Sequence, residues 1–297
     1  MKRLLAFAAL IALALAGSDV PALAQSSNDN QIEMQIGQQE YQQLQQKGEI
    51  IASSPLYAEL NPIAESIKRV ADPQYFAPFK FILVHESAPN AFAVPGGNVY
   101  VTDSLMKFVQ NKEELAGVLC HETSHDIHHD VLNLYKKDQH VATTYQIGDI
   151  LANVLTGGRA SGIIDAVASN AFNLQTLRFS RDVEANADYK GAQTCAQAGW
   201  NPWGMVWLFK HFETIDQQNP PEFMSDHPSD QARIAALEHE FASDPSLFGR
   251  YKDNVADATP LAASSGPRRT TTAAHGGTTR TAARHNQPFG PGSGYKF

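Results

Sequence analysis

The sequence predicts an α+β domain that is mostly helical and carries a small antiparallel β-sheet. Three observations support this fold class. Several stretches repeat apolar residues at helical intervals, two short β-branched and aromatic stretches lie within residues 79–103, and one helical stretch, "VLCHETSHDIHHD" at 118–130, is unusually rich in histidine. The chain has 297 residues, of which 43% are hydrophobic, so it can bury one large core or two modest ones.

Two helices are expected at the front of the domain. Residues 30–47 are polar and rich in glutamine, but apolar side chains recur among them at helix-like intervals: Ile32, Ile36, Tyr41 and Leu44. Residues 56–70 repeat a clearer helical period that ends before Asp72-Pro73. Pro62 either kinks this second helix or marks its start.

The expected sheet comes next. Residues 79–86, "FKFILVHE", and 98–103, "NVYVTD", are rich in β-branched and aromatic side chains. Pro95-Gly96-Gly97 supplies a turn just before the second stretch. We therefore predict an antiparallel arrangement of these strands.

Four further helices are expected after the sheet. They cover residues 112–129, 181–198, 202–214 and 229–241, and Gly199 with Asn201-Pro202 ends the second of them. Residues 141–177 are weakly amphipathic and carry charges, which predicts helical packing or a mobile flap rather than a membrane span.

The two ends of the chain differ in character from the body. Lys2 and Arg3 precede the thirteen apolar residues 4–16, and Ala22-Leu23-Ala24 resembles the small-residue site of a signal peptidase. We expect a signal peptide at 1–24, removed on export to the periplasm, with secretion into the medium as the alternative. Thirteen apolar residues fall short of the roughly twenty that span a bilayer, so no transmembrane segment is expected in the mature chain.

The main domain is expected at 25–254, followed by a disordered basic tail at 255–297. The tail carries five Lys and Arg residues against one Asp and has few large apolar side chains. Residues 25–254 carry sixteen basic and twenty-nine acidic residues, which argues against nucleic acid as the main partner. Because the tail and the domain are oppositely charged, self-inhibition by the tail is a further hypothesis.

The chain has two cysteines, Cys120 and Cys195. An even count in an exported protein is compatible with a disulfide bond. Both residues lie in apolar helical patterns, where a free cysteine behaves as a small hydrophobic residue. Two buried thiols are therefore the favoured interpretation.

The histidine-rich stretch contains the pattern His-Glu-x-x-His. His121 and His125 are one helical turn apart, so both side chains project from one face toward a common point, as two nitrogen ligands of zinc require. Glu122 is rotated away around the helix, where its carboxylate can act as a general base on a water molecule. The five-residue pattern is only moderately specific, and a catalytic zinc needs a third protein ligand.

A second acidic pair is the candidate source of that ligand. Glu184 and Asp188 are one turn apart in "RFSRDVEANADYKGAQ", residues 178–193. Glu184 is predicted to bind the metal while Asp188 accepts the second ring N–H of a ligand histidine. A solvated acidic helix face is the alternative, but the small residues on this helix favour close packing, and burial of Glu184 without a positive partner is costly.

With these motifs in view, the chain resembles the family of zinc metallopeptidases that includes the CAAX prenyl proteases and the bacterial periplasmic peptidases that act in outer-membrane protein assembly. The resemblance rests on five stretches in the family's order, spanning roughly residues 30–241: "NAFAVPGGNVYV" (90–101), "EELAGVLCHETSHDIHHD" (113–130), "FSRDVEANAD" (179–188), "AGWNP" (198–202) and "DHPSDQARIAALE" (226–238). It implies a zincin-like fold with the sheet beside the metal-binding helix.

The resemblance also implies roles for individual residues. It places one Zn²⁺ on His121, His125 and Glu184. Glu122 is implied to be the base, and Asp188 is implied to accept a hydrogen bond from a ligand histidine. The exposed edge of a strand formed by Asn90, Ala91, Phe92 and Ala93 is implied to pair with the substrate main chain. His227 matches a histidine that can approach the metal in related enzymes. It is a fourth ligand that closes the resting site, a donor to the oxyanion, or an ordinary surface histidine.

The function implied is that of an exported zinc endopeptidase. It would hydrolyse unfolded or misassembled envelope proteins with a metal-activated water and Glu122 as general base. Peripheral association with the outer-membrane assembly machinery is a further implied partnership, although the chain lacks the helical-repeat domain that some relatives use for docking. The alternative is a periplasmic chaperone or binding module for outer-membrane proteins, in which zinc only stabilises the fold.

Overall fold

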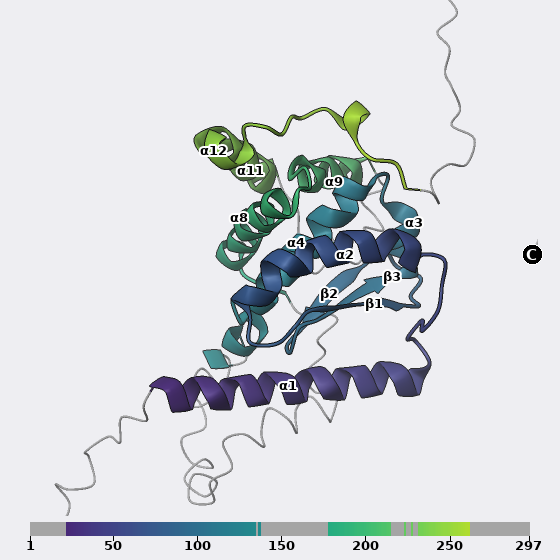
Figure 1. The fold of residues 1–297 in the computed structure, drawn as a ribbon, viewed down its shortest axis with the longest axis vertical. Helices are drawn as coiled ribbons and strands as arrows, with labels where there is room; N and C mark the ends of the chain where they lie inside the picture. Colours follow the sequence, from purple (N-terminus) through teal and green to yellow (C-terminus); the bar gives the residue numbers. More distant parts are fainter. Residues whose placement is uncertain are drawn as a thin grey trace, which may run out of the picture. The chain divides into compact units, whose positions relative to one another are not determined.

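The computed structural model describes residues 22–134, 136–137, 178–214, 223, 227 and 231–261. The expectations for residues 1–21, for 141–177 and for the tail beyond residue 261 lie outside the described residues. A 3-stranded sheet and the helices around it make up the described part (Figure 1). No helix among the described residues is long and apolar enough to span a bilayer.

The elements follow the expected order. The strands are β1 (Lys80–Val84), β2 (Ala91–Val94) and β3 (Asn98–Thr102). The helices are α1 (Ala22–Lys47), α2 (Tyr57–Ala71), η1 (Asp72–Gln74), α3 (Asp103–Phe108), α4 (Lys112–Ile127), α8 (Arg181–Ala198), α9 (Trp203–Glu213), α11 (Gln231–Ser243), α12 (Pro245–Phe248) and η3 (Val255–Asp257). Pro62 lies inside α2, so it does not mark the start of that helix.

The sheet is mixed, and the prediction of a purely antiparallel sheet is wrong. Its strand order is β1-β3-β2, with β1 parallel to β3 and β2 antiparallel to β3. The chain reverses direction once before β2 and once at the turn after it. Strands β1 and β3 therefore run in the same direction. Gly96 and Gly97 adopt φ values of 94° and 85° in that turn, a region that favours glycine.

Side chains alternate between the two faces of the sheet and build two cores. Leu83, Val99 and Val101 face the larger core, which α2, α4, α8 and α9 complete. The smaller core lies against α1, on the other face; its buried members are Ile32, Ile36, Leu44, Val84, Phe92, Val94, Tyr100, Val131 and Leu132. Figure 1 shows α1 running along the sheet on the side away from α2.

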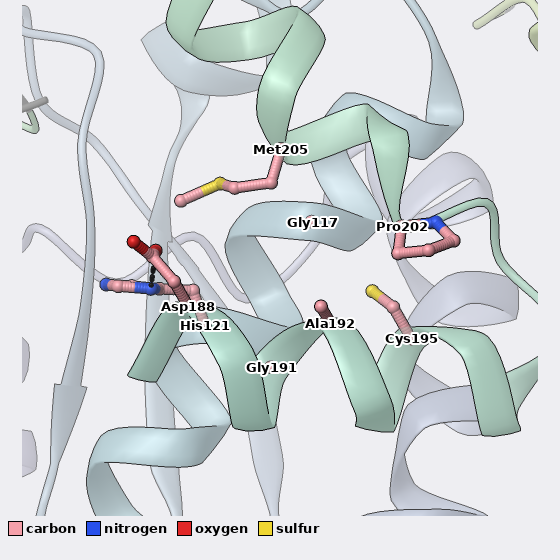
Figure 2. Close-up of a pocket in the computed structure, with 8 residues that line it drawn as sticks. All are labelled: Gly117, His121, Asp188, Gly191, Ala192, Cys195, Pro202 and Met205. Carbon is pink, nitrogen blue, oxygen red and sulfur yellow. Dashed lines mark ion pairs between the residues drawn. The ribbon is translucent and has the colours of Figure 1, made fainter. Parts of the chain in front are cut away.

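Helix α4 lies at the centre of the larger core. Asn111 caps its N-terminus by accepting a hydrogen bond from the N–H of Glu114, and nearly all of its residues are buried. Helix α8 packs closely against it, because a Cβ atom on Gly191 would lie 3.0 Å from the Cα of His121. Gly191, Gly117, Ala192 and Met205 line the small hollow where α4, α8 and α9 meet (Figure 2).

Cys120 of α4 and Cys195 of α8 form a disulfide bond, so the prediction of two buried thiols is wrong. The two Cα atoms are 5.8 Å apart, within the range that a disulfide requires. Both helices are apolar around these positions, as expected, but the sequence pattern of one helix does not reveal which residue of another lies against it. The bond joins the two helices that carry the expected metal ligands.

The ordered chain continues past residue 254, where the sequence predicts the domain to end. Thr259 donates two hydrogen bonds to Glu113, one from its N–H and one from its hydroxyl, each of 2.8 Å. Leu261 is 1% exposed and belongs to the larger core. Residues 255–261 therefore belong to the folded domain rather than to a disordered tail.

Candidate metal centre

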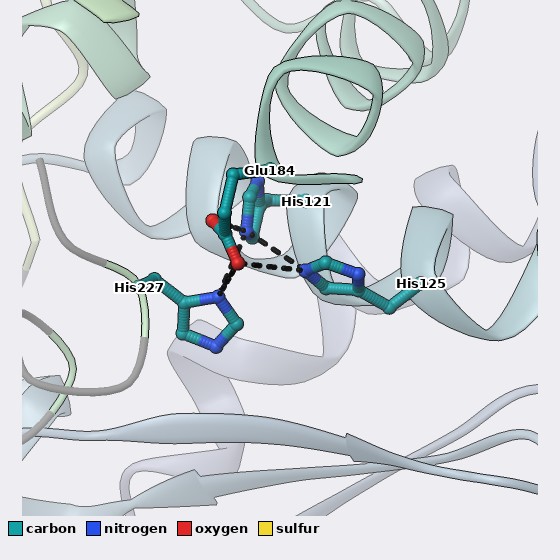
Figure 3. Close-up of side chains that lie close together, drawn as sticks. All are labelled: His121, His125, Glu184 and His227. Carbon is teal, nitrogen blue, oxygen red and sulfur yellow. Dashed lines mark hydrogen bonds and ion pairs between the residues drawn. The ribbon is translucent and has the colours of Figure 1, made fainter. Parts of the chain in front are cut away.

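Four buried side chains from distant parts of the sequence converge beside the sheet. They are His121 and His125 of α4, Glu184 of α8 and His227, and one ligand atom from each lies within 4.8 Å of the others (Figure 3). Their exposed fractions are 1%, 1%, 2% and 3%. The sequence predicts His121, His125 and Glu184 as ligands and leaves the role of His227 open, and the structure brings all four side chains together.

The spacing of these atoms fits a single zinc ion. At ligand distances of 2.0–2.1 Å, two ligands of a tetrahedral zinc are about 3.3 Å apart. The Nε2 atoms of His121 and His125 are 3.1 Å apart, and Glu184 lies 3.5 Å from the first through Oε2 and 3.8 Å from the second through Oε1. Nδ1 of His227 lies 3.3 Å from Nε2 of His121 and 2.9 Å from Oε1 of Glu184. Two or three imidazoles and one carboxylate are also a donor set that zinc prefers.

Carboxylates on the outer side fix the orientation of both ligand imidazoles of α4. Oδ1 of Asp188 lies 3.1 Å from Nδ1 of His121, the contact that the sequence predicts for Asp188. Oδ2 of Asp130 lies 2.8 Å from Nδ1 of His125. In both rings Nε2 therefore faces the cluster. Sequence analysis assigned no role to Asp130, although it follows His125 by little more than one helical turn.

Arg233 of α11 is the second residue that sequence analysis missed. Its guanidinium donates two hydrogen bonds of 2.7 Å to Asp188, from Nε and Nη2, and a third of 3.1 Å to the carbonyl of His227. Its Nη1 also lies 3.0 Å from Oε2 of Glu184. Arg233 is only 7% exposed and lies over the ring of Phe209. One buried cation thus links α8, α11 and His227.

The charges around the cluster set the protonation of its members. Burial would lower the pKa of His121, but hydrogen bonds and charges from Asp188 and Glu184 outweigh it and raise the pKa to about 10. Burial is the main cause that lowers the pKa of His227 to about 4, and it also lowers the pKa of His125. The pKa of Glu184 is lowered despite burial, because His121 and His227 donate hydrogen bonds to it. His125, His227 and Glu184 are thus in the forms that bind a metal, whereas His121 must release its proton when a metal binds.

Glu122 lies beside the cluster and is 1% exposed. Its Oε2 accepts a hydrogen bond of 2.9 Å from the N–H of Ala93 in β2, and its Oε1 lies 3.5 Å from Nε2 of His227. Glu122 is not one of the four residues whose ligand atoms converge; its carboxylate is held by β2 and lies next to His227.

Strand β2 is at the edge of the sheet, but its edge is covered. The residues expected to bind substrate are 0–8% exposed: Asn90, Ala91, Phe92 and Ala93. The N–H of Phe223 donates to the carbonyl of Pro89, just before β2. In this structure Glu122 accepts the N–H of Ala93 on this edge, and the N–H of Phe223 occupies the carbonyl of Pro89 beside it.

Other candidate groups do not join the cluster. His129 pairs with Glu33, and His128 contacts the carbonyl of Ser124. The hollow behind His121 and Asp188 in Figure 2 has a volume of about 10 Å³, far below the range of small-molecule sites. It is a packing gap between helices.

A helix with His-Glu-x-x-His, a glutamate from a second helix and a small sheet beside them define a zinc metallopeptidase. Comparison with known families gives the same class: the model of Peptidase family M48 matches residues 56–241. The chain belongs to Peptidase family M48.

Several curated proteins are similar to the chain. The Beta-barrel assembly-enhancing protease of Escherichia coli strain K12 is 26% identical over 209 residues, which is 68% of this chain and 42% of that protein. The protein of the same name from Yersinia pestis is 29% identical, over 53% of this chain and 33% of its own length. The Mitochondrial metalloendopeptidase OMA1 of Schizosaccharomyces pombe is 29% identical, over 59% and 51%. The chain thus spans less than half of the two bacterial relatives.

Proposed function

We propose that the protein is a zinc-dependent endopeptidase that cleaves unfolded or misassembled protein chains. The observation that carries the proposal is the convergence of His121, His125 and Glu184, with the carboxylate of Glu122 beside them. Bound there, zinc would polarise a substrate carbonyl and lower the pKa of a water molecule.

The residues of the chain supply the proton transfer. Glu122 acts as general base toward the attacking water and then returns the proton to the leaving amine. The N–H of Ala93 holds one oxygen of Glu122, which orients the carboxylate. Asp188 and Asp130 hold the two imidazoles with Nε2 inward.

The substrate is proposed to pair through its main chain with the edge of β2. Along β2, alternate residues direct their backbone N–H and C=O groups toward β3 and away from it. Phe92 and Val94 direct these groups toward β3, and Ala91 and Ala93 direct them away from it. Recognition of main chain places little demand on side chains, which suits unfolded substrates. Phe223 must leave Pro89 before a substrate strand can extend along this edge.

His227 is proposed to close the resting site as a fourth ligand. Its Nδ1 lies within 3.3 Å of both His121 and Glu184, and it is fully surrounded by protein. Once displaced from the ligands, the same imidazole could donate to the oxyanion through the nitrogen that now faces Glu122.

Cleavage of unfolded casein by the zinc-loaded protein, with and without a chelator, tests the proposal. Glu122→Gln should retain one zinc per chain and lose at least about 100-fold in kcat/KM, because it removes the base. Glu65→Gln, an exposed glutamate of α2, is the matched control and should cleave like wild type. A zinc-loaded Glu122→Gln protein that cleaves at the wild-type rate rules out the role of Glu122.

The convergence of four ligand residues favours a second candidate, a zinc-stabilised chaperone for outer-membrane proteins. Structural zinc sites are usually closed by four protein ligands. In that case the protein would suppress aggregation of an unfolded substrate with zinc bound and would release no fragments. Fragment release that a chelator abolishes favours the peptidase.

Export to the periplasm and peripheral contact with the outer-membrane assembly machinery remain parts of this proposal. Export is supported by the basic and apolar residues 2–16, and the contact with the assembly machinery is supported by the name of the bacterial relatives. Secretion into the medium is the alternative destination. Fractionation of cells that express the full chain distinguishes the two compartments, and crosslinking in the same cells tests the contact.

A further inference from the structure

Helix α1 precedes the region that the family model matches, which begins at residue 56. Its buried face nevertheless contributes to the smaller core together with Phe92 and Val94 of β2. The same face carries Glu33, which is 1% exposed, and Gly37. A buried glutamate is costly unless it has a hydrogen-bonding or charged partner, so the side chains that surround Glu33 indicate its role.

Glu33 is the centre of a hydrogen-bond chain that reaches the turn between β2 and β3. The hydroxyl of Tyr75 donates to its Oε2 at 3.0 Å, and Nδ1 of His129 lies 2.8 Å from the same oxygen. The oxygen of the Tyr75 hydroxyl in turn accepts the N–H of Gly96 at 3.0 Å. The carboxylate on α1 is therefore connected to the backbone of the turn through one phenol.

The backbones of α1 and the turn also touch directly. A Cβ atom on Gly37 would lie 2.2 Å from the carbonyl oxygen of Pro95, and one on Gly96 would lie 3.3 Å from the carbonyl oxygen of Glu33. Gly37 cannot carry a side chain without separation of the helix from the turn, and a side chain on Gly96 would press against the backbone of Glu33. Both glycines therefore set the distance between α1 and the turn.

The other side of the turn is held by the metal-binding helix. The N–H of Gly97 donates to Oδ2 of Asp126 on α4 at 3.1 Å. From this turn β2 leads back to Ala93, whose N–H holds Glu122. The position of the turn between α1 and α4 therefore determines where the backbone of β2 meets the proposed base.

We infer that Glu33 and Gly37 are positioning residues of the peptidase, which hold the Pro95–Gly97 turn and so set strand β2 against Glu122. The inference rests on the proposed function for its role in catalysis. It extends the catalytic domain to α1, which reaches the turn through Tyr75 and through the close approach of Gly37 to Pro95.

Steady-state kinetics on an internally quenched unfolded peptide test the inference. Glu33→Ala should raise KM about tenfold or more, because loss of a buried hydrogen bond to a charged group corresponds to about that factor. Glu33→Gln keeps an acceptor oxygen and should recover most of the loss. Gln38→Ala, on the exposed face of α1, is the control. A purely structural role would lower only the amount of zinc-loaded enzyme, so that KM and the kcat per bound zinc stay at wild-type values, and that result overturns the inference.

A second readout is independent of catalysis. Amide hydrogen exchange in residues 91–98 should be faster in Glu33→Ala than in wild type, and unchanged in Gln38→Ala. If the wild-type protein cleaves nothing, the proposed function fails while exchange still tests the contact with the turn. If Glu33→Ala does not fold, the same measurements are made on Tyr75→Phe, which removes only the hydroxyl between Glu33 and Gly96. Unchanged KM and unchanged exchange in folded Tyr75→Phe would contradict the inference.

Discussion

Arg233 and Asp188 form a buried bidentate ion pair, in which Nε and Nη2 each donate a hydrogen bond of 2.7 Å to the carboxylate. Asp188 also holds Nδ1 of His121, so the pair lies directly behind a ligand of the proposed zinc. A planar guanidinium suits this geometry, because its donors match two carboxylate oxygens at once. Arg233 thus places a positive charge against two buried acids, Asp188 and Glu184.

Replacement of Arg233 should therefore destabilise the protein strongly. Arg233→Met keeps most of the volume but leaves Asp188 and Glu184 buried without the guanidinium charge. We expect the free energy of unfolding to fall by about 3–5 kcal/mol, which is the usual cost of removing one partner of a buried ion pair. Urea unfolding in the presence of a chelator measures this change.

Arg233→Lys should lie between wild type and Arg233→Met, since an ammonium group cannot form the bidentate contact. Arg69→Met is the matched control, because Arg69 is exposed on α2. Equal stability of Arg233→Met and Arg69→Met would show that the pair contributes nothing.

The pair of His129 and Glu33 should make stability depend on pH. The hydrogen bond to Glu33 raises the pKa of His129 above its ordinary value, although partial burial opposes the shift. A raised pKa means that the contribution is complete below the unfolded pKa of about 6.5 and is lost as pH rises through the folded pKa. His129 is 38% exposed in its side chain, so we expect an effect of about 1 kcal/mol or less.

His129→Asn is the test variant, because asparagine tolerates the left-handed φ of 56° at this position. The difference in unfolding free energy between wild type and His129→Asn should shrink between pH 6 and pH 9. A difference that stays constant over this range would mean that His129 does not titrate against Glu33.

The disulfide bond should contribute to stability by closing a long loop. Cys120 and Cys195 are 75 residues apart, and disulfide bonds typically contribute about 2–4 kcal/mol, with longer loops toward the upper end. Oxidised protein should therefore unfold at higher urea concentration than the Cys120→Ala/Cys195→Ala double variant or the reduced protein. Thiol titration of the unfolded, unreduced protein should detect no free thiol, and two free thiols would contradict the bond.

Gly191 should be intolerant of even a methyl group. In Gly191→Ala the new Cβ would lie 3.0 Å from backbone atoms of His121. A helix backbone cannot relieve this contact by a rotamer change, as a side chain can. We expect a loss of about 1–3 kcal/mol and weaker zinc binding, because Glu184 on the same helix moves with it. A zinc titration with a competing chelator measures the second effect, with exposed Gln197→Ala of α8 as control.

The ligand residues were predictable from the sequence for a local reason. His121 and His125 share a helix, and a spacing of four residues places them on one face whatever the rest of the fold does. Glu184 was predictable because a second helix carries it together with Asp188 at the same spacing. His227 was predictable only through the resemblance to a family, since nothing local distinguishes it from a surface histidine.

Contacts between elements could not be read from the same patterns. The sequence of β1 does not state that it lies parallel to β3, and the apolar positions of Cys120 and Cys195 do not reveal that the two thiols meet. Arg233 and Glu33 lie in helical stretches where charged residues are usually solvated. Only the tertiary arrangement buries them, and only burial gives each a specific partner.

The central claim is that His121, His125 and Glu184 bind one zinc ion. An anomalous difference map from a crystal of the zinc-loaded protein, collected at the zinc absorption edge, tests it most directly. The account predicts a single strong peak within about 2.0–2.2 Å of both Nε2 atoms and of a carboxylate oxygen of Glu184. A map with no peak there, or with Glu184 turned away from both imidazoles, would contradict it.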